Sequence, residues 1–152
     1  MYEGDSGEDA AIESNLRATI RLNADFAPAH DALAMFYATR ERKLNEAYGL
    51  STRAIELDPD SLIYRVDCAD VMMEQEQFTE ALEMLGAARR LAKTPYEVDA
   101  VESRVARVER RRMAQAAPAG RVKDVSLELP TGRGNALPDG VDKTLGVDGI
   151  GQ

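Results

Sequence analysis

The feature that most constrains the fold of this chain is an internal repeat. The dipeptide Glu46-Ala47 recurs as Glu80-Ala81, and the same shift aligns Ala54 with Ala88. Repeats of this length, about 34 residues, are typical of paired helices, each pair stacking on its neighbours to bury a shared core. The chain is therefore expected to form an array of helix pairs.

Apolar residues recur at helical spacing along most of the chain and predict six amphipathic helices. Their expected ranges are 9–22, 27–40, 44–57, 61–75, 78–92 and 95–116. The last of these has a capping box, with Thr94 as N-cap, Pro95 at the first helical position and Glu97 closing the box. Connections of only a few residues make neighbouring helices antiparallel. The predicted fold class is all-α, an α-solenoid of antiparallel helix pairs.

Composition divides the chain into three zones. Residues 10–117 contain only two of the eleven glycines and are expected to form the helical repeat domain. Residues 1–9 are acidic and are expected to be a flexible lead-in. Residues 118–152 hold seven glycines and three prolines, which disfavour helices, so this tail is expected to be mostly disordered.

The repeat has a characteristic set of small and apolar positions. One copy carries His30, Leu33, Ala34, Tyr37, Ala47, Ser51, Ala54 and Pro59. The next carries Arg65, Cys68, Ala69, Met72, Ala81, Leu85 and Ala88. This spacing resembles the tetratricopeptide repeat (TPR) family, whose pattern is Trp-x2-Leu-Gly-x2-Tyr on the first helix, then Ala-x3-Phe, Ala and Pro. The resemblance covers about residues 10–110 and implies helix pairs whose backbones approach closely at the alanines.

The first expected helix and Glu102 depart from the pattern of a regular repeat array, and both departures indicate which part of an array this chain forms. The helix at 9–22 matches a second helix that lacks its partner, so its apolar face is expected to be half covered. Glu102 stands where the family has a small residue, and a buried carboxylate there would be costly. The helix at 95–116 is therefore expected to be a terminal cap with one solvated face. We expect the chain to be the C-terminal part of a longer, bacterial-type TPR protein.

Little in the sequence points to chemistry. The single His30 and the single Cys68 both occupy packing positions of the repeat, so neither is expected to be catalytic. One cysteine excludes an internal disulfide, and one His with one Cys leaves no soft-metal site. The formal net charge of −8 argues against nucleic-acid binding. We expect no catalytic activity, no cofactor, no metal and no membrane insertion.

The resemblance implies a binding groove, because the first helix of each TPR pair lines a concave surface that binds a peptide or partner helix. Transferred by position, the groove residues are Asp31, Met35, Ala38, Thr39, Ile63, Val66, Asp67, Asp70, Met73, Glu74, Tyr96, Asp99, Ser103 and Arg107. This set is acidic and contains methionines, which suit adaptable binding surfaces. A basic or amphipathic ligand is the preferred interpretation.

A cluster of arginines lies near the end of the last expected helix. It comprises Arg104, Arg107, Arg110, Arg111 and Arg112. Helical spacing places Arg104, Arg107 and Arg111 on one face. Cations at a helix C-terminus complement the helix dipole, so the preferred interpretation is a solvated and dipole-compensating end, for which pairing with acids of the array stays open. Docking of an acidic partner, and binding of nucleic acid or an anionic membrane, are the alternatives.

The function expected from these features is that of a non-catalytic protein–protein interaction module, or scaffold, that binds a partner peptide or helix. The alternative is the C-terminal accessory region of a larger enzyme, such as a peptidase or glycosyltransferase. The partner is another protein, and self-association through the exposed first helix stays open. The compartment is also open, with a soluble cytoplasmic protein preferred for this chain alone.

Overall fold

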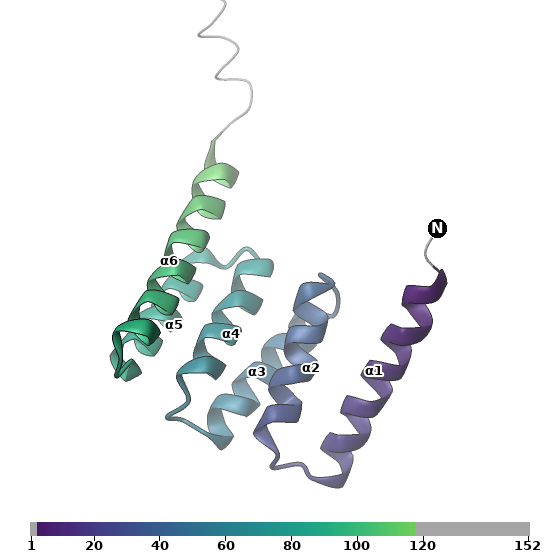
Figure 1. Ribbon diagram of the computed structural model, residues 1–152. Coiled ribbons are helices and arrows are strands. Elements are labelled where there is room, and N and C mark those ends of the chain that lie inside the picture. The colour runs from purple at the N-terminus through teal and green to yellow at the C-terminus, as the bar shows by residue number, and fades with distance from the viewer. Residues whose placement is uncertain (1–2, 118–152) are drawn as a thin grey trace, which may run out of the picture. The chain divides into compact units, whose positions relative to one another are not determined.

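The computed structural model describes residues 3–117 of the 152-residue chain. Over this range the protein is all-α, with six helices and no strand (Figure 1). The helices are α1 (Glu3–Leu22), α2 (Ala27–Thr39), α3 (Leu44–Leu57), α4 (Leu62–Glu74), α5 (Phe78–Leu91) and α6 (Pro95–Ala116). The predicted all-α class is confirmed for this part of the chain.

The chain divides into two compact units, Met1–Arg112 and Met113–Gln152. The first unit contains α1 to α5 and most of α6. Of the second unit, the structure describes only the end of α6 and Ala117. The tail predicted to be disordered, residues 118–152, lies outside the described residues.

Helix boundaries follow the local signals in the sequence. The predicted ranges for α2 to α6 agree closely with the observed ends. The capping box of α6 is formed, since the backbone N–H of Glu97 donates to Thr94 Oγ1 over 3.2 Å. In return, Glu97 Oε2 accepts from the backbone N–H of Thr94 at 3.0 Å. Local chemistry therefore fixes where this helix begins.

The start of α1 was predicted wrongly. Residues 3–9, expected to be a flexible lead-in, belong to the helix. Acidic residues near a helix N-terminus interact favourably with its dipole, and this stretch of the sequence is acidic. Asp9 also accepts two hydrogen bonds of 2.6 Å from the Arg40 guanidinium at the end of α2. This tertiary contact ties the N-terminal half of α1 to the end of α2.

Helices α1 to α5 pack against one another in chain order. In the first unit, α1 packs on α2, α2 on α3, α3 on α4 and α4 on α5, and α2 also contacts α4. The alanines at which close approach was predicted lie in these contacts. Ala34, Ala47, Ala54, Ala69, Ala81 and Ala88 are all buried. Small side chains let the helix backbones come close, as the repeat pattern requires.

The apolar core has two parts. One is built around Leu33, Phe36 and Tyr37 of α2, with Ile12, Leu16 and Ile20 of α1 packed against it and partly buried. The other joins α4, α5 and α6, where Val101 and Val108 are fully buried. The expectation that α1 is half covered is therefore confirmed.

A polar network holds α1 to α2 and to the turn that follows α2. The Glu13 carboxylate accepts hydrogen bonds from Tyr37 Oη at 2.7 Å and from Lys43 Nζ at 2.7 Å. It also accepts from Arg17 at 3.2 Å and from Arg42 at 3.3 Å. These donors keep the pKa of Glu13 well below its usual range, at about 2, with the Lys43 hydrogen bond the largest cause.

Candidate interaction surface

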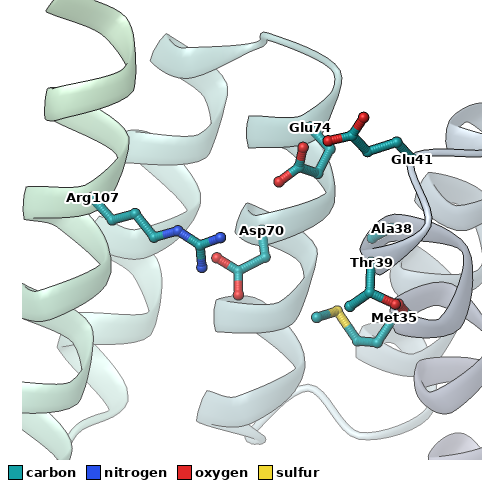
Figure 2. A pocket seen from close by; sticks show the side chains of 7 residues that line it. All are labelled: Met35, Ala38, Thr39, Glu41, Asp70, Glu74 and Arg107. Atoms are coloured by element: carbon teal, nitrogen blue, oxygen red, sulfur yellow. The ribbon is translucent and has the colours of Figure 1, made fainter. Parts of the chain in front are cut away.

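Helix α4 lies between α2 and α6 (Figure 1). Residues of these three helices line a cleft of about 290 Å³ (Figure 2). Its lining residues are Met35, Ala38, Thr39, Glu41, Asp70, Glu74 and Arg107. They come from three helices and from the turn after α2, so Met35 and Arg107 meet here although they lie far apart in the sequence. The cleft is therefore a product of helix packing and not of one local motif.

Most of the lining residues belong to the predicted groove. The structure brings together Met35, Ala38, Thr39, Asp70, Glu74 and Arg107 of that set around the cleft. Asp31 and Asp67 are partly buried and lie next to each other across α2 and α4. Ile63, Tyr96, Asp99 and Ser103 are exposed but do not line the cleft.

Two predicted groove residues belong instead to the core. Val66 is almost fully buried and Met73 is completely buried, both in the cluster shared by α4, α5 and α6. Their assignment as surface-lining residues was wrong, because α6 packs over α4 and covers these positions. A family pattern aligned by position does not report how closely the next helix approaches.

Glu41 lines the cleft, and the groove prediction did not include it. It follows the last turn of α2 and has a left-handed backbone conformation, with φ of 50°. Non-glycine residues seldom adopt that conformation, so helical spacing could not have placed its side chain. Glu41 is exposed, and its carboxylate is directed toward Glu74 across the cleft (Figure 2).

The arginines of α6 pair with the acids of α4. Arg104 Nε lies 3.0 Å from Asp70 Oδ2, and an Arg111 nitrogen lies 2.7 Å from Glu74 Oε1. The acids of these pairs are shielded, since the Asp70 side chain is 7% exposed and that of Glu74 is 13% exposed. These ion pairs therefore join α6 to α4.

The arginine cluster is therefore only in part the solvated helix end that the sequence favoured. Arg104 and Arg111 are engaged with α4, and Arg112 pairs with Glu109 of its own helix at 2.9 Å. Arg110 is exposed, and Arg107 lines the cleft. Periodicity correctly placed several arginines on one face, but tertiary packing turned that face toward carboxylates.

Burial and neighbouring negative charges raise the pKa values of the aspartates between α2 and α4. Asp31 and Asp67 are close neighbours, and burial together with the charge of Asp67 raises the pKa of Asp31 to about 7. Burial also raises the pKa of Asp67 and of Asp70, and the latter effect is opposed by Arg104. Asp31 therefore keeps its proton over a range in which isolated aspartates are ionised.

His30 and Cys68 are packed as predicted. His30 is buried, and its Nε2 lies 2.8 Å from the Ala24 carbonyl oxygen. Cys68 is completely buried, and burial raises the pKa of its thiol to about 11. Both side chains thus serve the core of the helix pairs.

The described part of the chain has neither a metal-binding cluster nor a membrane-spanning helix. No group of three or more His, Cys, Asp or Glu side chains is arranged to hold a metal ion in residues 3–117. In the same range, no helix has the length and apolar character needed to cross a membrane.

The chain matches no protein-family model, and no curated protein is significantly similar to it in sequence. The resemblance to TPR proteins therefore rests on the residues and spacings themselves.

Proposed function

We propose that this protein is a non-catalytic interaction module that binds a segment of another protein on the face formed by α2, α4 and α6. The observation that carries the proposal is the cleft, which gathers side chains from three helices around one opening. A surface of this kind contacts an extended or helical segment without chemistry.

The proposal includes a TPR-like arrangement of the helices. Three observations support this arrangement. The repeat aligns Glu46-Ala47 with Glu80-Ala81, and the alanines at the contacts within the pairs α2–α3 and α4–α5 are buried. In addition, α2 contacts α4, which belongs to the next pair. In such an array α2, α4 and α6 are the first helices of successive pairs. Their exposed residues then form one continuous binding face.

The charges on this face favour a basic or amphipathic partner. Among the described residues that line the cleft, Glu41, Asp70 and Glu74 face the single cation Arg107. Exposed Ile63 and Tyr96 on α4 and α6 supply apolar side chains on the same helices. Charge complementarity of this type governs association rate and partner choice more than it governs affinity.

Site-specific photo-crosslinking in the full chain tests the face. A benzophenone amino acid replaces Ile63 or Tyr96, which are exposed on α4 and α6, and in a control it replaces Tyr48, which is exposed on α3. A partner first identified by affinity purification and mass spectrometry should crosslink from positions 63 and 96 and not from position 48. Crosslinking from position 48 alone would refute the proposed face.

A further inference from the structure

We infer that the cleft lined by α2, α4 and α6 is a subsite for one long cationic side chain, Lys or Arg, of the bound segment. This inference rests on the proposed function, and it names the chemistry that the face selects. It follows from the shape of the cleft, from the acceptors that stay open around it and from the position of Arg107 at its edge.

The cleft has the two surfaces that a lysine or arginine side chain needs. Met35 and Ala38 form an apolar wall on α2, while Glu41 and Glu74 bring two carboxylates toward each other (Figure 2). Lysine and arginine bury an apolar stem and keep the charged head among polar groups. At about 290 Å³, the cleft is far larger than the volume of about 30 Å³ that one water occupies in the liquid.

The buried Asp70 supplies a second, independent reason. It is 5% exposed and lines the cleft, and its Oδ2 is bonded to Arg104. Its Oδ1 is buried and has no hydrogen-bond partner among the described residues. Buried carboxylate oxygens without a donor are unfavourable. The head group of an incoming cation would satisfy this oxygen.

Arg107 shows where such a cation would sit. Its guanidinium points toward Asp70 across the cleft, yet no ion pair of Arg107 is formed within residues 3–117 (Figure 2). It does lower the pKa of Asp70 through its charge. Arg107 therefore competes with the cation of a ligand, so its removal should strengthen binding while removal of a lining carboxylate should weaken it.

Met35 provides a local reporter for the test. The full chain is prepared with isotope-labelled methionine methyl groups, and the Met35 signal is identified from the spectrum of Met35→Leu. The probes are Nα-acetyl-lysine methylamide and its norleucine counterpart, which has a similar stem and no charge. The lysine probe should shift the Met35 methyl signal in a saturable way, whereas the norleucine probe and the signal of exposed Met113 should show no such change.

Three variants give the expected direction of each effect. Glu41→Gln should lower the affinity for the lysine probe by about two- to fivefold, as expected for the loss of one exposed ion pair. Arg107→Gln should raise that affinity by a similar factor. Glu76→Gln is the matched control, because Glu76 also follows a helix with positive φ and lies outside the cleft. It should leave the affinity unchanged.

The outcomes separate this inference from the proposed function. Equal shifts with both probes, or no shift of Met35 up to about 10 mM lysine probe, would overturn the cationic subsite. If the partner still crosslinks from positions 63 and 96, the interaction face stands without that subsite. Failure of crosslinking together with a lysine-specific shift would remove the proposed face and leave a cation site.

Discussion

Arg104 on α6 donates a hydrogen bond from Nε to Asp70 Oδ2 on α4 over 3.0 Å, although the two residues are 34 positions apart. With the pair between Arg111 and Glu74, it joins α6 to α4 and sets the outer wall of the cleft. The same acids that give the face its negative charge thus also help to hold the last helix in place.

Arg104→Gln should therefore destabilise the protein. The substitution leaves the carboxylate of the buried Asp70 without its charged donor, which should lower the free energy of unfolding by about 1–3 kcal/mol. Urea denaturation of the full chain measures the change. Arg110→Gln is the control, since Arg110 is exposed on the same helix and should change stability by less than about 0.5 kcal/mol.

A double-mutant cycle separates the pair from its surroundings. Asp70→Asn combined with Arg104→Gln should cost less than the sum of the single changes, because neither partner is then a buried unpaired charge. Strict additivity would mean that the contact between Arg104 and Asp70 contributes nothing to the attachment of α6.

Glu13→Gln should change how stability depends on acid. The pKa of Glu13 is lowered to about 2 in the folded protein, so its contribution is present above its ordinary pKa of 4.5 and is lost as the pH falls toward about 2. The variant should melt at a lower temperature than the parent near neutral pH, and the difference should shrink on acidification. Thermal unfolding followed by circular dichroism at several pH values measures this.

Glu8→Gln serves as the control for Glu13, because Glu8 is exposed on the same helix. Its melting temperature should follow that of the parent over the whole pH range. A difference between Glu13→Gln and the parent that stays constant down to acid pH would show that the ionised carboxylate is not what holds α1 against α2.

Asp31→Asn should have the opposite dependence on pH. The pKa of Asp31 is raised to about 7, so the folded state binds a proton that the unfolded state has released, and stability falls as the pH rises from about 4 to about 7. An asparagine can donate to Asp67 without ionising. The variant should flatten this slope and melt at a higher temperature than the parent at about pH 8.

The surroundings of Asp31 include other groups that titrate. Its partner is Asp67, and Tyr64 and Cys68 also sense its charge, while Arg104 interacts with Asp67. Asp99→Asn is the control, because Asp99 is exposed on α6. If Asp31→Asn keeps the slope of the parent between about pH 4 and pH 7, the group that takes up the proton in the folded state is not Asp31.

Ala47→Leu and Ala81→Leu should each overpack a contact between paired helices. Both alanines are completely buried, so the added atoms must displace the facing backbone, at a cost of about 1–3 kcal/mol. Ala106→Leu, at an exposed position of α6, should have a much smaller effect on urea denaturation. Buried variants as stable as the parent would contradict the assignment of the small-residue positions.

Much of the site could be predicted because its residues occupy equivalent positions in successive repeats. The resemblance to the TPR repeat, transferred position by position, implied that Met35, Thr39, Asp70 and Glu74 lie on one binding face, and the structure brings these four residues together at the cleft. Glu41 could not be found in this way, since its direction depends on a left-handed turn. Met73 was misplaced, because spacing alone does not show how far α6 covers α4.

The sequence by itself determined the all-α class, the ends of α2 to α6 and the buried alanines, because these depend on side-chain periodicity, capping and size within a short stretch of chain. Only the tertiary structure decided that α1 begins at Glu3, that Arg104 and Arg111 pair with Asp70 and Glu74, and that three helices enclose one cleft. Those features depend on the approach of side chains that lie far apart in the sequence. Their geometry is set by how the helices pack and not by the pattern of any one of them.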